Sequence, residues 1–211
     1  MTRQYGLGVD ALLSIDLVLA NLTIVTASET QNAELFRAIR GSGGGTYGIA
    51  LSLTVKLYEN PGVMSTFGGV YALNNQTAAM FANWMLNAPN RAVGYFLPRN
   101  LGPSSKFITI DAYCFGNTSF CTPVLSPLQV GCLPIAELNV DCNPKYEAYS
   151  NFYEFFGGPS DSGGVLYLSS TAFNATNILS ALQDVITFID QNEYTLCSGR
   201  FLLGSKINTL I

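Results

Sequence analysis

Apolar and polar positions alternate from the first part of the chain onward. Leu13, Ile15 and Leu17 alternate with Ser14 and Asp16, which predicts a strand with one buried face. Residues 23–27 form a second β-rich run directly after Asn21-Leu22. We therefore expect residues 12–27 to fold as a β-hairpin.

The next stretch, Glu34–Pro61, predicts a short helix, a glycine run and a long strand. Leu35, Phe36 and Ile39 recur at helical spacing, and Gly41 follows where a helix commonly ends. Ser28 and Gln31 have the form of a capping box, and Asn32 is a competing N-cap. From Ile49 to Tyr58 apolar and polar residues alternate, so one face of this strand is expected to meet a core.

Residues after Val63 predict further helices and strands. Strands are expected over 66–73, 106–114 and 165–169, helices over 77–86 and 178–189, and a long connection with a short helical piece over 115–143. The aromatic residues Tyr146, Tyr149, Tyr153 and Phe156 predict another helix, whose stripe is either core or a pocket lining. Ile108, Ile110, Ala112 and Cys114 should share one strand face, with Asp111 and Tyr113 on the other. Helices covering one side of a sheet indicate an α+β fold.

The glycine run carries the clearest chemical signal. Its glycines are Gly41, Gly43, Gly44, Gly45 and Gly48. Such a stretch bends sharply and lets a ligand reach peptide N–H groups. No Lys-Ser or Lys-Thr pair follows, which excludes a P-loop, and the helix-then-strand order is the reverse of a dinucleotide-binding Rossmann unit. A ligand loop and a plain turn that needs only small residues both remain open.

Composition removes several function classes. The chain has 211 residues, of which 11% are charged, a net charge of −4 and no histidine. The lack of histidine excludes Ser-His-Asp triads and most catalytic zinc sites, and we expect no metal. Basic residues are scattered and no apolar run is long enough to span a bilayer, so neither nucleic acid nor a membrane is an expected partner.

The cysteines and glycosylation sequons bear on the cellular compartment. The five cysteines lack paired C-x-x-C spacing, and sequons begin at Asn21, Asn75, Asn117 and Asn174. Together they favour a secreted or secretory-pathway protein, with structural disulfides, over an intracellular protein with buried thiols. No signal-peptide pattern follows Met1.

Four sequence blocks carry a family resemblance. They are residues 5–10 (YGLGVD), 26–28 (TAS), 35–41 (LFRAIRG) and 43–49 (GGGTYGI). In this order and at these separations they resemble the berberine-bridge-enzyme-like flavoproteins of the vanillyl-alcohol-oxidase superfamily. The resemblance covers about the first sixty residues.

The resemblance implies a fold and a cofactor. Residues 1–62 are expected to form the C-terminal part of a PCMH-type FAD-binding domain. Residues 63–211 are expected to form part of a substrate-binding α+β domain, an antiparallel sheet covered by helices. The expected FAD-binding residues are Tyr5, Gly6, Gly8, Val9, Gly41, Gly43, Gly44, Gly45, Gly48 and Ile49. Ala11 departs from the family, which commonly has an amide residue there.

The resemblance also implies a reaction. Family members transfer a hydride from an alcohol, sugar or alkaloid-like small molecule to FAD, and oxygen usually reoxidises the flavin. Asp111 and Tyr113 lie on the strand face that would meet the flavin, but no catalytic residue is identified. The family's flavin-attachment and C-terminal segments are not recognisable, so the chain is expected to be a fragment. The alternative is a truncated, non-catalytic remnant or an incomplete gene model that acts at most as a binding or scaffold protein.

Overall fold

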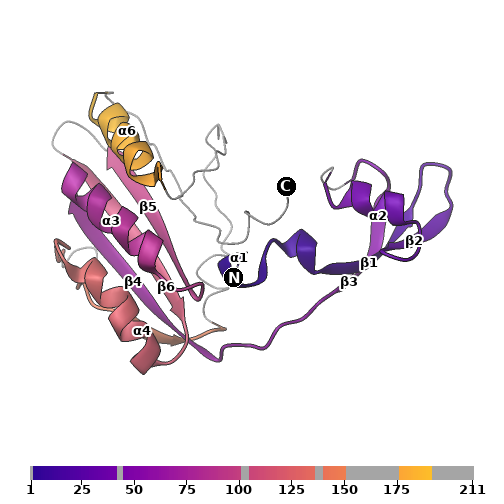
Figure 1. Ribbon diagram of the computed structural model, residues 1–211, viewed down its shortest axis with the longest axis horizontal. Helices are drawn as coiled ribbons and strands as arrows, with labels where there is room; N and C mark the ends of the chain where they lie inside the picture. The colour runs from indigo at the N-terminus through magenta and orange to yellow at the C-terminus, as the bar shows by residue number, and fades with distance from the viewer. Residues whose placement is uncertain (1, 42–44, 101–104, 136–139, 151–175, 192–211) are drawn as a thin grey trace. The chain divides into compact units, whose positions relative to one another are not determined.

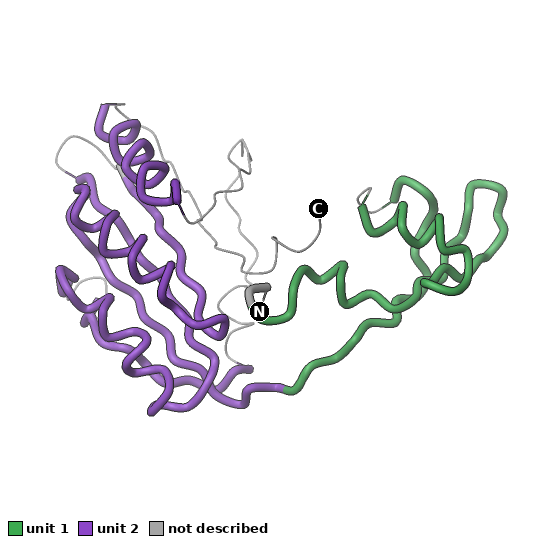
Figure 2. Tube along the Cα trace, viewed as in Figure 1, with its two compact units in different colours: residues 1–59, 206–211 green, residues 60–205 purple. Residues whose placement is uncertain are grey.

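The described residues fall into two compact units. The computed structural model describes residues 2–41, 45–100, 105–135, 140–150 and 176–191. One unit extends to Glu59 and the other begins at Asn60 (Figure 2). Each unit has its own sheet and its own hydrophobic core.

The described part of the first unit is a small three-stranded antiparallel sheet with two short helices. Its elements are α1 (Thr2–Tyr5), the 3-10 turn η1 (Gly8–Ala11), β1 (Leu12–Val18), β2 (Ile24–Ser28), α2 (Ala33–Ile39) and β3 (Ile49–Val55), with strand order β2-β1-β3 (Figure 1). The predicted hairpin is confirmed, since β1 and β2 pair from Ser14 opposite Ser28 to Val18 opposite Ile24. Its core consists of Ile15, Leu17, Ala27 and Phe36.

The Asp16 carboxylate links the three strands on the sheet face opposite the core residues. Thr26 Oγ1 donates to Asp16 Oδ1 and Ser52 Oγ donates to Asp16 Oδ2, each at 2.6 Å. The hydrogen bonds from Ser52 and Thr26 stabilise the ionised form and lower the pKa of Asp16. Asp16 therefore links β1 to both of its neighbours.

The helix start differs from the prediction. Ser28 Oγ accepts from the Gln31 amide at 3.1 Å, but this bond closes a turn before the helix instead of capping it. Asn32 holds the N-cap position in a left-handed conformation, with φ of 49°, and its side chain makes no cap bond. It donates instead to the Thr26 carbonyl at 2.8 Å, because the turn brings it back over β2.

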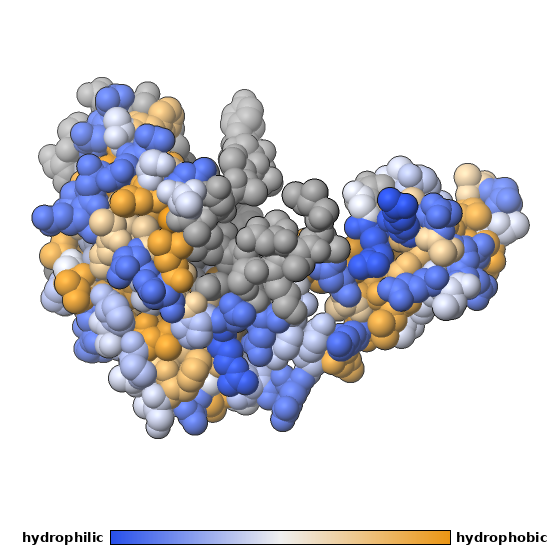
Figure 3. Space-filling view, in the orientation of Figure 1, coloured by the Kyte–Doolittle hydropathy of each residue, from blue (hydrophilic) through white to orange (hydrophobic). Residues whose placement is uncertain are grey.

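The expectation that β3 meets a core is wrong. Every residue of β3 is exposed, including Ile49 at 72% and Leu53 at 60%. The reason is geometric, because β3 is an edge strand and α2 packs against β1 and β2. Hydrophobic side chains accordingly reach the surface of this unit (Figure 3).

The second unit is a four-stranded antiparallel sheet covered by helices on one face (Figure 1). Its elements are β4 (Val63–Ala72), α3 (Asn75–Asn87), β5 (Ala92–Asn100), β6 (Lys106–Phe115), α4 (Thr118–Leu125), η2 (Ser126–Gln129), β7 (Lys145–Ala148) and α6 (Ile178–Gln191), with strand order β5-β6-β4-β7. The expected strands at 66–73 and 106–114 and the helices at 77–86 and 178–189 are confirmed.

Alternation along β4 and β6 separates two faces. Phe67, Tyr71, Ile108 and Ile110 pack beneath the helices. They contact a core that also contains Phe81, Trp84 and Met85 of α3 and Leu182 and Ile186 of α6. The opposite face carries Thr66, Gly68, Thr109, Asp111 and Tyr113. Among the described residues, the sheet thus has one face covered by helices and one face that no helix covers, called the open face below.

Two elements differ from expectation. Tyr146 lies in β7, which pairs with the start of β4, so the aromatic helix is wrong over the described residues 145–150. Tyr153, Phe156 and the strand expected at 165–169 lie outside the described residues. No element was predicted over β5, which is an edge strand among the described residues, a position where Pro98 is tolerated.

Two disulfides belong to this unit. Cys114 pairs with Cys121 and Cys132 pairs with Cys142, while Cys197 lies outside the described residues. The first joins the end of β6 to α4, and the second closes the connection that leads to β7. No helix in the described part of the chain has the length and hydropathy of a membrane span.

The packing of α3 on β5 predicts a severe effect at Gly94. A Cβ there would meet Trp84 Cζ3 at 2.4 Å, and Trp84 is held in place because its Nε1 donates to the Val124 carbonyl at 2.7 Å. Gly94→Ala should therefore lower the free energy of unfolding by about 1–3 kcal/mol through overpacking. Urea denaturation measures this effect. Gly68→Ala in the same sheet is the control, since its Cβ meets only Asp111 Oδ1 at 3.7 Å. Equal stability of the two variants would contradict the prediction.

Candidate functional site

The first predicted block, residues 5–10, forms a turn that is tied to α2. Gly6 has a φ of +88°, which a glycine adopts without strain, and the Leu7 amide donates to Asp10 Oδ2 at 2.9 Å. Arg40 at the end of α2 lies 3.7 Å from Asp10 Oδ1. The structure thus brings the first block next to the residue that precedes the glycine run.

The glycines of the run and of η1 differ in what surrounds them. A Cβ at Gly8 or Gly45 would meet no atom within 4 Å, and at Gly41 only the Ala38 carbonyl, at 4.0 Å. Gly45 also has a φ of +90°. Gly43 and Gly44 lie outside the described residues. Within the described part of the chain, Gly8, Gly41 and Gly45 therefore leave open space beside the backbone.

Gly48 has a different reason to be glycine. A Cβ there would lie 2.5 Å from the Val18 carbonyl oxygen, so the residue permits the close approach of β3 to β1. Packing alone accounts for this position.

The other predicted cofactor residues have side chains in varied surroundings. The Tyr5 ring stacks on Tyr58 with centroids 4.1 Å apart. Val9 is half-buried within η1, and Ile49 is exposed opposite Val18 in the sheet. Any contact that uses the Tyr5 ring must involve the face that Tyr58 leaves uncovered.

A pocket of about 300 Å³ lies on the open face of the second unit. Its floor comes from β4 and β6, and its wall from β7 and the preceding segment. The lining residues are Met64, Thr66, Phe67, Gly68, Gly69, Val70, Thr109, Asp111, Tyr113, Val140, Asp141, Asn143, Lys145 and Glu147. The volume is at the lower end of the range for small-molecule sites.

The pocket is rich in hydrogen-bonding groups. It contains three carboxylates, from Asp111, Asp141 and Glu147, and one ammonium, from Lys145. Lys145 Nζ lies 3.9 Å from Asp141 Oδ2. The carboxylates accept hydrogen bonds, whereas the ammonium and the Thr and Asn side chains donate them. This lining suits a polar ligand that carries several donors and acceptors.

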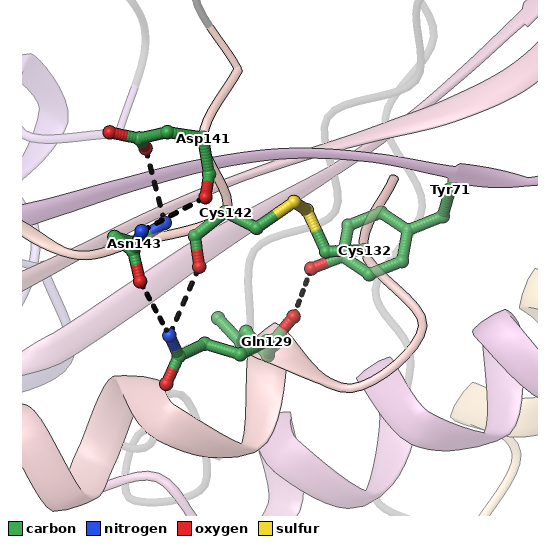
Figure 4. The surroundings of a disulfide bond; sticks show 7 residues. Tyr71, Gln129, Cys132, Asp141, Cys142 and Asn143 are labelled. Atoms are coloured by element: carbon green, nitrogen blue, oxygen red, sulfur yellow. Dashed lines mark hydrogen bonds between the residues drawn. A yellow bond between two sulfur atoms is a disulfide. The ribbon is translucent and has the colours of Figure 1, made fainter. Parts of the chain in front are cut away.

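The segment that forms the pocket wall is fastened to the sheet and to η2 (Figure 4). Gln129 Nε2 donates to the Cys142 carbonyl and to Asn143 Oδ1, both at 3.1 Å. The Cys132–Cys142 disulfide bridges the same segment, and the Ile135 and Val140 amides each donate to the other residue's carbonyl. These contacts hold Val140, Asp141 and Asn143 beside the pocket.

The buried side chain of Tyr71 is hydrogen-bonded to η2. Its hydroxyl donates to the Leu128 carbonyl, one residue before Gln129 (Figure 4). Burial raises the pKa of Tyr71. The hydroxyl therefore remains a donor throughout the neutral range.

Sequence reasoning found Asp111 and Tyr113 but missed the rest of this pocket. Tyr113 is only 3% exposed and contacts the Tyr95 ring edge-on. Lys145 preceded the predicted aromatic helix and Glu147 was placed within it, whereas both lie in β7. The alternation in residues 66–73 could have identified part of the pocket floor, because it placed Thr66 and Gly68 on the same strand face.

Curated relatives share most of this chain. An uncharacterized FAD-linked oxidoreductase of Arthroderma benhamiae is 28% identical over 229 residues, covering 96% of this chain and 38% of the relative. The FAD-linked oxidoreductase sor8 of Hypocrea jecorina is 31% identical over 172 residues, covering 73% and 27%. The glucooligosaccharide oxidase of Sarocladium strictum is 30% identical over 132 residues, covering 61% and 26%. No family model matches the chain.

Solved structures show the same fold. The berberine-bridge-enzyme-like protein 1 of Physcomitrella patens superposes with a TM-score of 0.64 at 18% identity, covering 91% of this chain and 43% of that protein. A xylooligosaccharide oxidase of Myceliophthora thermophila, solved with xylobiose, gives 0.61 at 22% identity, with 90% and 42% covered. This chain is a homologue of FAD-linked oxidoreductases, and its fold is that of the berberine-bridge-enzyme-like proteins.

The superpositions confirm the α+β fold expected from the sequence, including an antiparallel sheet covered by helices. The chain spans about a quarter to two-fifths of the length of the curated relatives given above. It therefore corresponds to part of those FAD-linked oxidoreductases.

The fastening of the pocket wall leads to a prediction about local stability. Replacing Cys132 and Cys142 by serine removes the cross-link that limits opening of their loop. We expect the Ile135 and Val140 amides to exchange with solvent at least about tenfold faster, a change of ~1.4 kcal/mol in opening free energy. Hydrogen exchange measured by NMR gives both values. The amides of Ile108 and Ile110, in the centre of the sheet, are the control and should keep their rates. Unchanged exchange at Ile135 and Val140 would show that the disulfide does not hold this wall.

Proposed function

We propose that this protein is an FAD-dependent oxidoreductase that oxidises a small molecule. The observation that carries the proposal is the similarity to FAD-linked oxidoreductases over 96% and 73% of the chain. Bound FAD supplies the acceptor for a hydride from the substrate, and the protein supplies binding and orientation. Molecular oxygen is the proposed final electron acceptor, in keeping with relatives that are named oxidases.

The first unit is proposed to hold the cofactor. The residues that would contact FAD are Tyr5, Gly6, Gly8, Val9, Gly41, Gly43, Gly44, Gly45, Gly48 and Ile49. The space around Gly8, Gly41 and Gly45 fits this role, because an added Cβ there would meet almost no atom of the described residues, so that a phosphate or ribose group could approach the backbone. Gly48 and Ile49 would contribute through the backbone at the start of β3.

The second unit is proposed to hold the substrate. Its open sheet face carries the pocket floored by β4 and β6, and the pocket lining exchanges hydrogen bonds readily with hydroxyl or amine groups. Two relatives are named for oligosaccharides, a glucooligosaccharide oxidase and a xylooligosaccharide oxidase. An alcohol or a sugar hydroxyl is therefore the proposed site of oxidation, with an alkaloid-like amine as the alternative substrate class.

A secreted glycoprotein is the proposed setting. Two disulfides join Cys114 to Cys121 and Cys132 to Cys142, and such bonds persist in oxidising compartments. The sequon residues Asn21 and Asn117 are exposed, where glycans are accepted.

The alternative, a non-catalytic remnant, has less support. The relatives given above carry the names of FAD-linked oxidoreductases and of an oxidase. The space beside Gly8, Gly41 and Gly45 is also expected of a chain that still binds its cofactor.

Titration with FAD tests the cofactor assignment. Gly45→Val should weaken FAD binding at least about tenfold, ~1.4 kcal/mol, because it adds a side chain where the cofactor is proposed to lie. Gly62→Val is the matched control, since Gly62 also has a positive φ, of +73°, and no neighbour within 4 Å. Calorimetry and flavin absorbance measure the affinity. A wild-type chain that binds no FAD, or a Gly45→Val chain that binds it normally, would refute the assignment.

A further inference from the structure

We propose that Gly68 sets the substrate specificity of the pocket, by leaving the sheet backbone bare so that a neutral sugar ring lies on it and donates a hydroxyl to Asp111. This inference rests on the proposed function, because it concerns the site assigned to the substrate. It adds a residue that decides which ligands enter and the chemistry of the ligand that fits.

Gly68 has no evident folding reason to be glycine. It lies inside β4 with no positive φ, directly opposite Asp111 in β6. A Cβ at this position would meet only Asp111 Oδ1, at the ordinary contact distance of 3.7 Å. Glycine weakens the interior of a strand and often marks a place where a ligand approaches the backbone.

The neighbouring Gly69 shows the contrast. It faces the covered side, where a Cβ would lie 2.7 Å from Tyr71 Cε2 and 2.9 Å from Phe67 Cε1. Packing beneath the helices therefore requires glycine at position 69. At position 68, among the described residues, glycine instead preserves space that belongs to the pocket.

The groups around Gly68 define the ligand. Asp111 projects beside it, and Thr66 and Thr109 line the same floor. An ionised carboxylate has about four lone-pair sites, so Asp111 can accept from a ligand in addition to the protein. The wall adds Asn143 and the Lys145–Asp141 pair. Three carboxylates against one ammonium disfavour an anionic ligand, and the mixed donors and acceptors favour a neutral polyol.

The experiment measures xylobiose binding to the full 211-residue chain by calorimetry, together with thermal unfolding. Gly68→Ala should weaken binding by a few fold and Gly68→Val by at least about tenfold, since the larger side chain covers more of the floor. Because valine suits a strand better than glycine, the same variant should keep its Tm or gain about 2 °C. Loss of binding without loss of stability distinguishes a ligand-contact role from a structural one.

Ala72→Val is the matched control. Ala72 lies on the same strand and the same face as Gly68, is exposed, and does not line the pocket. Its variant should bind xylobiose like the wild type. Asp111→Asn tests the hydroxyl contact and should weaken binding while leaving binding of FAD unchanged.

Three results would overturn the inference. These are a wild-type chain that does not bind xylobiose, a Gly68→Val chain that binds it normally, and a Gly68→Val chain that loses stability in parallel with binding. The outcome is separable from the proposed function, because FAD titration is a different measurement. Lost FAD binding with a clear Gly68 effect would contradict only the cofactor assignment. Normal FAD binding with no Gly68 effect would contradict only this inference.

Discussion

The antiparallel pairing of β4 with β6 is the constraint on which the second unit depends. The register runs from Met64 opposite Phe115 to Ala72 opposite Phe107, without a bulge. Because side chains alternate between faces along both strands, this register sorts the apolar residues beneath the helices and the polar ones onto the open side. A shift by one residue would place Asp111 in the core and Ile110 in the pocket. The hydrophobic core and the candidate site are therefore two results of one pairing.

In the first unit, the proposed ligand site depends more on backbone geometry than on the burial of side chains. Its core is small, and its predicted contacts with a ligand come from glycines and peptide groups. The Asp10–Arg40 pair brings together two segments that are 30 positions apart in the sequence. A site of this kind depends on turns that keep their shape, which the Leu7–Asp10 turn and the strand links at Asp16 provide.

Local patterns were sufficient to predict the elements whose faces are buried. The α3 stripe of Phe81, Trp84 and Met85 and the alternation in β6 both point to one core, and both are found. The secondary-structure predictions failed where the local sequence pattern favours one element and the tertiary fold imposes another. Tyr146 and Tyr149 have helical spacing, yet residues 145–148 complete the edge of the sheet by pairing with β4. No strand was predicted for β5, and its Pro98 fits a strand there because β5 lies at an edge, a position that only the whole sheet defines.

The candidate pocket could be predicted only in part for a related reason. Asp111 was placed on the correct strand face, but Asp141, Lys145 and Glu147 join it through a strand pairing between segments about 80 residues apart and through a disulfide. Cysteine spacing alone left the partner of each cysteine open. Pairing of Cys114 with Cys121 follows once the end of β6 turns back into α4, which is a fact of the fold and not of the spacing.

The exposed edge of β3 has a consequence for the physical behaviour of the protein. Its outer side carries peptide groups that no neighbouring strand satisfies among the described residues, next to Leu51, Leu53 and Val55. An apolar strand edge of this kind is a template for intermolecular β-pairing. Concentrated samples are therefore expected to self-associate through the first unit, while the second unit, with β5 ending in Pro98, Arg99 and Asn100, has a better-protected border.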